Sequence, residues 1–315
     1  MASVIGRARD NICLLETLTL RSSKEGDCSI CKQKYPYFAI QFKSLKSICS
    51  YQLQDHTNLK SDNLIVEIGD YGMSFMIFDF ESNKLKLLNM FEFEKQDDLL
   101  RNLQMQDTWL SSKIDSDCKV FVFYNFRESI LVPEKFHNKD NSGSLLDLMF
   151  GQSEDYILIQ EHVSSKSIYN IYRVPEQIHH WFMLHFPKCA FKHSSSNQTE
   201  EIKEGTVIRC IVSFGSLKVI FSNQGQLQLI QHFPYSSPED ALYFLLRVCE
   251  THGVKPTDVK IQLNGLLTSD SALFDLIYNY FTDIDFYSSS FSDIEMENGI
   301  ELPAHYFSHL LDLAS

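Results

Sequence analysis

The residues best suited to metal or redox chemistry are two cysteines near the start of the chain. Cys28 and Cys31 form a CxxC motif, and thiolates at this spacing bind zinc or exchange disulfides. A zinc site needs a second pair of ligands, and only Cys13, Cys49 and His56 are near in sequence. A redox motif needs a strand before it and a helix after it, and neither pattern is evident. We therefore interpret this region as an extension without a metal.

Histidines and serines further along the chain also lack a catalytic pattern. His179, His180 and His185 fall on one predicted helix, but none of them forms the i, i+4 pair that binds a metal. Ser213 and Ser216 lack the G-x-S-x-G context of a hydrolase nucleophile. The sequence predicts no catalytic residue and no metal ligand.

The composition narrows the possible partners. The 315 residues include 28 Lys and Arg against 41 Asp and Glu, for a net charge of −13. A surface that binds nucleic acid along its phosphates is basic, so this balance makes nucleic acid an improbable partner. No apolar run is long enough to span a membrane. We expect no membrane partner and a cytoplasmic protein, with its eight scattered cysteines mostly free thiols.

The elements that would position a site occur twice. Residues 64–93 and residues 207–233 each read as strand, turn, strand, turn, strand. A helix and a short strand follow each meander, at 96–106 and 119–124 in the first case. In the second case the helix is predicted at 238–251 and the strand at 259–263. Further strands are predicted at 156–161, 168–174 and 284–287, and further helices at 142–150, 175–185, 269–281 and from 303. This pattern predicts an α/β protein with two similar lobes.

The boundaries follow from composition. The polar stretch 193–206 is predicted to be a linker or exposed loop between the lobes. We predict a poorly ordered extension at 1–60, a first lobe at 61–200 and a second lobe at 201–315. The two halves align without gaps over the second strand of each meander when Gly72 is matched with Gly215, although chance similarity between two meanders is an alternative. The same alignment matches Phe75 with Lys218, Ile77 with Ile220 and Phe78 with Phe221.

Several short motifs, in order along about 230 residues, carry a resemblance to a known family. They are Gly72–Phe75, Leu131–Glu134, Tyr172–Pro175, Phe233, Ala241–Phe244 and Leu263–Gly265. In this order the chain resembles the DUF3822 family of uncharacterised Bacteroidetes proteins, which is grouped with the actin-like ATPases. That superfamily includes actin, the Hsp70 chaperones, sugar kinases and the PilM-like pilus-assembly ATPases. The resemblance implies a duplicated actin-like (ribonuclease H-like) fold, with a β-meander and helices in each lobe.

The resemblance also implies where a nucleotide would bind. Actin-like ATPases use acids and glycines in each first hairpin, because backbone N–H groups hold phosphates there and carboxylates hold Mg²⁺ through water. The first hairpin offers Glu67, Gly69, Asp70 and Gly72. An alternative is that the two glycines only permit a sharp turn and that both acids face water.

The other two elements depart from the superfamily pattern. In the second hairpin Gly215 is kept, but Ser213 stands where the alignment expects an acid, and Phe214 crowds the phosphate position. In the third element, Asn264 precedes the single Gly265 where the superfamily often has two glycines, and Leu266 adds apolar bulk. Phosphoryl transfer depends on positioning and charge stabilisation, so these losses predict a vestigial cleft for ATP and Mg²⁺ and no required cofactor.

Three functions are compatible with these observations. The leading hypothesis is a non-catalytic scaffold or interaction protein with a degenerate nucleotide cleft and a protein partner. The second is an ATP-binding protein or weak ATPase that uses Glu67 and Asp70. The third is an accessory factor in RNA or ribosome metabolism, which the net charge does not favour. The sequence alone does not define the oligomeric state.

Overall fold

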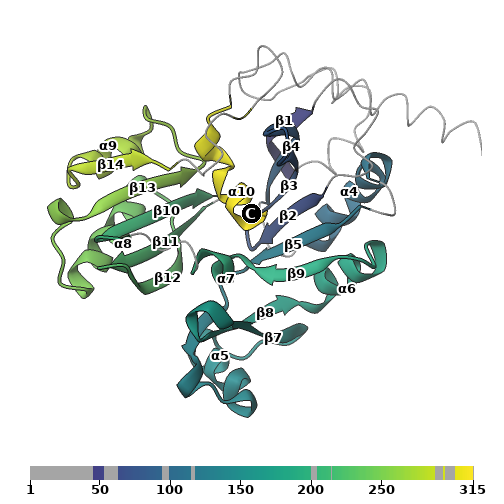
Figure 1. Ribbon diagram of the computed structural model, residues 1–315, viewed down its shortest axis with the longest axis horizontal. Coiled ribbons are helices and arrows are strands. Elements are labelled where there is room, and N and C mark those ends of the chain that lie inside the picture. The colour runs from purple at the N-terminus through teal and green to yellow at the C-terminus, as the bar shows by residue number, and fades with distance from the viewer. Residues whose placement is uncertain are drawn as a thin grey trace, which may run out of the picture. The chain divides into compact units, whose positions relative to one another are not determined.

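Three β-sheets organise the part of the chain that the computed structural model describes (Figure 1). The described residues are 45–52, 63–93, 99–114, 118–199, 204–213, 215–287, 294 and 302–314. All of them belong to one compact unit of the chain, Ser44–Ser315. The CxxC motif of Cys28 and Cys31 lies outside the described residues, and so does Phe214.

The first sheet has six strands in the order β1-β4-β3-β2-β5-β9. Its strands are β1 (Leu45–Gln52), β2 (Leu64–Gly69), β3 (Gly72–Asp79), β4 (Lys84–Phe93), β5 (Val120–Asn125) and β9 (Ala190–His193). Helices α4 (Leu99–Lys113) and α6 (Glu176–His185) cover one face through a shared apolar core. Trp181 and Phe182 lie on the apolar side of α6 and are part of that core.

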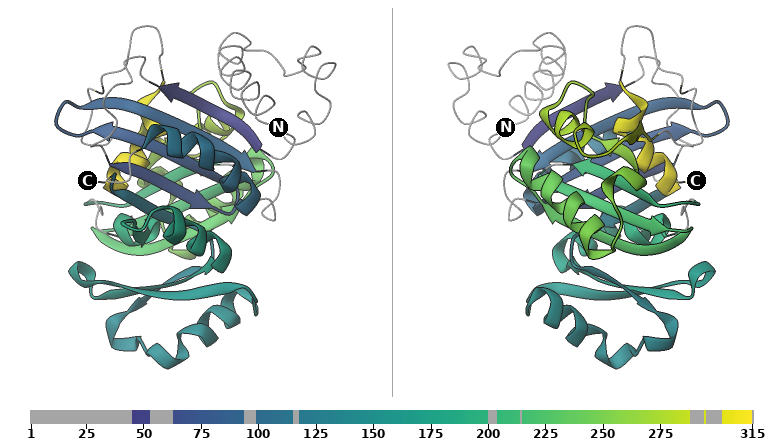
Figure 2. Two further views of the ribbon diagram at one scale, coloured as in Figure 1. Left: turned by 90° about the vertical axis from the view of Figure 1, so that its right-hand side faces the viewer. Right: turned by 90° about the vertical axis from the view of Figure 1, so that its left-hand side faces the viewer.

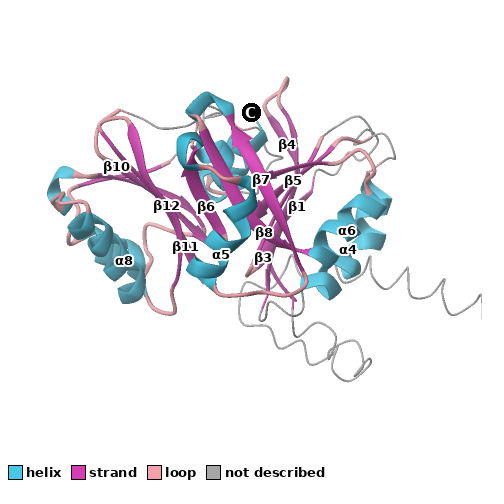
Figure 3. Ribbon diagram, turned by 90° about the horizontal axis from the view of Figure 1, so that it is seen from below, coloured by secondary structure: helices cyan, strands magenta, loops and turns pink. Residues whose placement is uncertain are grey.

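The second sheet has five strands in the order β12-β11-β10-β13-β14. These are β10 (Val207–Ser213), β11 (Ser216–Asn223), β12 (Gln226–Pro234), β13 (Lys260–Gly265) and β14 (Asp283–Phe286), covered by α8 (Pro238–Thr251) and α9 (Ala272–Tyr278). Helix α8 begins where predicted, because Ser237 and Asp240 form a capping box and Pro238 is the first helical residue. Figure 3 shows α8 on one outer side and α4 with α6 on the other, with the strands between them.

A small third sheet, in the order β6-β8-β7, is inserted between β5 and β9. Its strands are β6 (Ser129–Pro133), β7 (Tyr156–Val163) and β8 (Ile168–Pro175), and α5 (Ser142–Phe150) packs against it. Figure 2 shows this sheet and α5 below the two larger sheets. The sequence predicted α5, β7 and β8 in place but not that they form a separate sheet.

The two larger sheets are copies of one topology. The order β4-β3-β2-β5-β9 in the first matches β12-β11-β10-β13-β14 in the second. In the first sheet β5 pairs in parallel with β2 and β9, and in the second sheet β13 pairs in parallel with β10 and β14. Each copy also has a bulge at the same place in its meander, between Ile77 and Phe78 and between Phe221 and Ser222. The predicted duplicated α/β fold is confirmed.

The gapless alignment of the two meanders was wrong by one residue. Ile68 pairs with Met73 in the first hairpin and Val212 pairs with Leu217 in the second, 144 positions later. The core-facing residues repeat at the same interval, since Phe75 corresponds to Val219. A shift of one residue moves every side chain of a strand to the opposite face of the sheet. The counterpart of Ser74 is therefore Lys218, and that of Asp70 is Phe214.

The predicted linker at 193–206 was also wrong over its first half. His193 ends β9, and residues 194–198 form the short helix α7 (Ser194–Gln198). His193 and Ser194 are fully buried. The polar composition reflects a buried hydrogen-bonded cluster, described below, and not exposure to solvent.

Two further differences concern the ends of the chain. Residues 45–52, assigned to a poorly ordered extension, form the edge strand β1, which pairs with β4. The predicted terminal helix is the short turn Ala304–Tyr306 followed by α10 (Ser308–Ala314). Its residues Phe307, Leu310 and Leu311 are buried against Ile65 and other residues of the first sheet.

The remaining boundaries differ by a few residues. Helix α4 begins within the predicted range and continues to Lys113, beyond residue 106. Helix α9 is shorter than the predicted 269–281 because Ser271 caps its first turn. Within the described residues, none of the helices has the length and apolar character needed to cross a bilayer.

Candidate functional site

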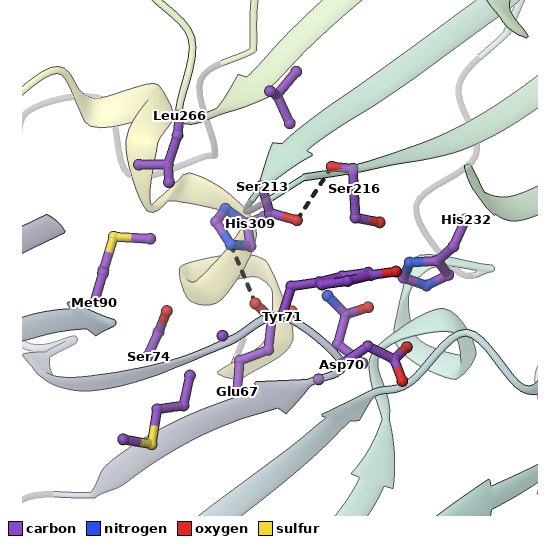
Figure 4. A pocket seen from close by; sticks show the side chains of 15 residues that line it. Glu67, Asp70, Tyr71, Ser74, Met90, Ser213, Ser216, His232, Leu266 and His309 are labelled. Atoms are coloured by element: carbon purple, nitrogen blue, oxygen red, sulfur yellow. Dashed lines mark hydrogen bonds and ion pairs between the residues drawn. The ribbon is translucent and has the colours of Figure 1, made fainter. Parts of the chain in front are cut away.

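A pocket lies where the first hairpins of the two sheets face each other (Figure 4). The space between its lining atoms, counted together with solvent at the open mouth, is about 490 Å³. The site residues predicted from sequence that line it are Glu67, Gly69, Asp70, Gly72 and Ser213. Of the other three, Asn264 and Gly265 lie immediately before the lining residue Leu266, and Gly215 is next to the lining residue Ser216. The structure thus brings both hairpins to one pocket.

Two of the glycines are required by the packing of neighbouring strands. A Cβ atom on Gly69 would lie 2.6 Å from the carbonyl oxygen of Asn125. On Gly265 it would lie 2.1 Å from the carbonyl oxygen of Val212, and Gly265 also has a φ of +84°. Both glycines end a strand that closely approaches its parallel neighbour. This role needs no bound phosphate.

The Asp70 carboxylate is engaged by the protein backbone. Its Oδ2 accepts a hydrogen bond of 2.8 Å from the backbone N–H of Arg127, in the loop after β5. Burial raises the pKa of the Asp70 carboxyl to about 6. The hydrogen bond from the Arg127 N–H and the positive charge of the Arg127 side chain both lower this pKa, but by less. A carboxylate that holds Mg²⁺ through water needs oxygens free to accept from that water, and one oxygen of Asp70 is already engaged by the Arg127 N–H.

Glu67 is joined to the C-terminal helix. Its Oε2 lies 3.5 Å from Nε2 of His309 on α10, and both side chains are buried. On the other side of the ring, His309 Nδ1 lies 3.3 Å from Oδ1 of Asn264 on β13. That oxygen also accepts the N–H of Gly265, so His309 Nδ1 must be the donor. Glu67, His309 and Asn264 therefore form a polar bridge from the first sheet to the second.

A buried lysine forms a second bridge between the sheets. Lys218 on β11 is 1% exposed, and its Nζ donates to Asn125 Oδ1 at 3.1 Å and to Ser194 Oγ at 2.8 Å. The Ser194 hydroxyl in turn donates to Asn125 Oδ1 at 2.8 Å. Both acceptors are uncharged. Burial lowers the pKa of the Lys218 ammonium to about 7, and the negative charge of Glu67 opposes that shift.

Two histidines complete the buried cluster. His193 is held as the neutral Nε2–H tautomer, because Nε2 donates to the Phe126 carbonyl and Nδ1 accepts the Ser195 N–H. Burial and the charge of Lys218 lower its pKa to about 3. His232 lies directly opposite Lys218 in the β11–β12 pairing, and among the described residues no hydrogen-bond partner reaches its buried Nε2. Burial and the charge of Lys218 also lower the pKa of His232 well below its ordinary value.

The second hairpin contributes no acid to the pocket. The Ser213 hydroxyl donates to the Ser216 carbonyl at 3.4 Å. From Val207 to Asn223 the sequence contains neither Asp nor Glu. The arrangement supplies one acidic hairpin, occupied by its own partners, and one hairpin without a carboxylate.

Sequence reasoning missed Asn125, Ser194, Lys218, His232 and His309. One signal for this cluster was available in the sequence. Lys218 is a cation within the apolar run Leu217–Phe221, and it lies on the strand face opposite to the core residue Val219. The misaligned hairpins matched it with a core phenylalanine. His309 gave no signal, because nothing in the sequence places the terminal helix beside the first hairpin.

Comparison with solved structures identifies the class. The repeated sheets are those of the actin-like ATPase fold. A Bacteroides thetaiotaomicron protein with this fold and unknown function matches with a TM-score of 0.63 at 17% identity, over 74% of this chain and 93% of that one. A PilM–PilN type IV pilus biogenesis complex matches with a TM-score of 0.49 at 10% identity, over 81% and 98%. The EutJ protein of Carboxydothermus hydrogenoformans matches with a TM-score of 0.44 at 9% identity, over 84% and 93%.

Sequence comparison then gives the family. The chain belongs to the family described as protein of unknown function (DUF3822), whose model matches residues 51–284. The search of curated proteins found no match.

Proposed function

We propose that this protein is a non-catalytic member of the actin-like superfamily that acts as a scaffold or interaction protein. The observation that carries the proposal is that buried side chains join the two sheets at and beside the pocket between the hairpins. Lys218 bonds Asn125 and Ser194, and His309 joins Glu67 to Asn264. A nucleotide in the pocket would meet Glu67 and Asn125 already engaged by these contacts.

The domain organisation supports the same role. We propose that the chain folds as two lobes divided near residue 200, with β1 added to the first and α10 packed across both. Two lobes bridged by buried contacts present a fixed surface to a protein partner, which suits a scaffold. The acidic composition fits a soluble protein of the cytoplasm and gives nucleic acid no favourable surface.

A second candidate is an ATP-binding protein or weak ATPase. The observation in its favour is that Glu67, Asp70 and Gly72 line the pocket together, as the first hairpin of an ATPase requires. Binding would need Asp70 to exchange its contact with the Arg127 N–H for a hydrated cation.

Thermal melting with and without Mg²⁺–ATP distinguishes the two candidates. A ligand at a hundredfold its dissociation constant adds about 2.7 kcal/mol to the free energy of unfolding, which is readily seen. We expect no shift at millimolar nucleotide. A shift that disappears in Asp70→Ala, but persists in the control Glu81→Ala at the exposed far turn of the same meander, would overturn the scaffold proposal.

A further inference from the structure

Among the described residues, the third sheet ends in a strand with little of the usual protection against pairing with another chain. Strand β7, Tyr156–Val163, is eight residues long and forms an edge of this sheet. Its pairing with β8 runs without a bulge from Tyr156 to Val163. The strand contains no proline, glycine or lysine, and its one acid, Glu161, is engaged within the fold, where its Oε2 accepts the backbone N–H of His193. Natural edge strands are normally short, bulged, charged with lysine, interrupted by proline or covered, because an open edge pairs readily.

The other sheet edges of the described residues have such protection. Strands β9 and β14 have four residues each. Strand β6 has five and ends at Pro133. The two longer edges, β1 and β12, are each interrupted by an irregularity in their pairing. Strand β7 is therefore distinguished from every other edge in this part of the chain.

The backbone groups that β7 presents outward can be assigned. The carbonyl of Asp155 accepts the N–H of Glu176, so residue 155 bonds toward β8. Tyr156 lies opposite Pro175, which has no N–H to donate. Bonding alternates along an antiparallel pair, so the backbone groups of Tyr156, Leu158, Gln160 and His162 point away from β8.

The side chains around this edge define what would pair with it. Acidic Glu154 and Asp155 precede the strand, basic Lys166 follows it, and all three are exposed. Between them lies the apolar run Tyr156–Ile159, in which Leu158 is 42% exposed. Five of the ten exposed large apolar side chains of the described residues belong to this small sheet, the turn after β6 and the helix α5; they are Phe136, Leu148, Met149, Phe150 and Leu158.

We propose that β7 pairs antiparallel with β7 of a second copy of this chain. Antiparallel pairing brings the acidic start of each strand to the basic end of the other, so the edge is complementary to itself. Such an isologous contact closes as a dimer and does not extend into a filament. When the two-fold axis of the pair passes at Ile159, the outward backbone groups of the two strands face each other. Leu158 of one copy then lies opposite Gln160 of the other. The two small sheets then form one continuous sheet of six strands.

Sedimentation analysis of the full chain over a range of concentrations tests this proposal. We expect a monomer–dimer equilibrium that Leu158→Lys weakens by about tenfold or more in dissociation constant, because the new charge blocks the edge. The matched control is Leu184→Lys on α6, where the leucine is 78% exposed and distant in sequence from β7. A monomer at all concentrations would overturn the proposal, and so would an equal effect of both substitutions.

Charge reversal gives a second test that does not alter the apolar strand. Glu154→Lys and Lys166→Glu should each weaken the dimer by placing like charges together. The double variant should recover part of the lost affinity, because positions 154 and 166 again carry opposite charges while Asp155 keeps its own charge. Failure of the double variant to recover relative to either single variant would exclude antiparallel self-pairing. None of these residues lines the pocket, so the outcome is separable from that of the nucleotide test.

Discussion

Lys218 of the second sheet donates a hydrogen bond of 2.8 Å to the hydroxyl of Ser194, which follows the last strand of the first sheet. An ammonium group so completely buried, with neutral oxygens as its acceptors, is costly to keep charged. The contact joins the two sheets beside the pocket, which Asn125, the other acceptor of Lys218, helps to line.

Replacing Lys218 tests whether this contact stabilises the fold or only fills the space. We expect Lys218→Met to be neutral or stabilising, because the apolar side chain keeps the volume without the desolvation cost. Lys218→Ala should lower the free energy of unfolding by about 2–4 kcal/mol through the cavity it leaves. Urea denaturation measures both. A Met variant as unstable as the Ala variant would show that the hydrogen bonds themselves are essential.

The low pKa of Lys218 also predicts a pH dependence. The folded-state pKa is about 7, while an unfolded lysine titrates near 10.4. Between these values the unfolded chain binds the extra proton, so the free energy of unfolding should rise with pH from about 7 to about 10. Subtracting the profile of Lys218→Met from that of the wild type isolates this contribution. A difference that is flat with pH over that window would show that Lys218 titrates normally.

Asp70 should show the opposite slope at lower pH. Its folded pKa is about 6, above the ordinary value of 3.8, so the folded chain holds the proton longer. Stability contributed by Asp70 should therefore fall as pH rises from about 4 to about 6. Asp70→Asn keeps an acceptor for the Arg127 N–H and should remove this slope, with stability at pH 7 unchanged or raised by about 1–2 kcal/mol. Loss of stability at pH 7 would contradict this assignment.

Gly265 should tolerate no side chain. Gly265→Ala adds a Cβ at 2.1 Å from a backbone oxygen and imposes a φ of +84° on alanine. We expect a loss of at least about 3 kcal/mol, from both steric overlap and backbone strain. The control Gly225→Ala shares a positive φ, +72°, but its Cβ would find its nearest neighbour at 4.0 Å. Thermal melting should show a cost near 1 kcal/mol for the control.

The pair of Glu67 and His309 should be strongly coupled. A double-mutant cycle with Glu67→Gln and His309→Gln is expected to give a coupling energy of about 1–3 kcal/mol, because both groups are buried. The control pair is Glu176 and His180 on α6, 4.0 Å apart and about half exposed, for which we expect no more than about 0.5 kcal/mol. Equal values for the two pairs would show that α10 is not fixed by this contact.

Much of this fold follows from local sequence signals. The meanders, α8 with its Ser237 cap, and the parallel strands were predictable because apolar periodicity and turn residues act over short distances. The register of the second hairpin was not predictable, because a repeat recognised by weak identity can slip by one residue. The slip becomes evident only when the structure shows which side chains face the core.

The buried polar cluster could not be predicted for a different reason. Ser194 looks like a linker residue until Lys218 and Asn125, distant in the sequence, supply its hydrogen-bond partners, and His193 does so until the Phe126 carbonyl accepts from its ring. The predicted acids and glycines of the first hairpin do line the pocket, but His309 reaches it from a helix near residue 310. Tertiary contacts over such separations leave no periodic trace in the sequence.

The position of α10 also bears on how the protein is made. Phe307, Leu310 and Leu311 cover apolar side chains such as Ile65 and Met76 that emerge from the ribosome more than two hundred residues earlier. Until Phe307, Leu310 and Leu311 have been synthesised, these apolar side chains of the first sheet lack that cover. The first lobe should thus be a client of chaperones during synthesis, and a polypeptide that stops near residue 290 should be prone to aggregate.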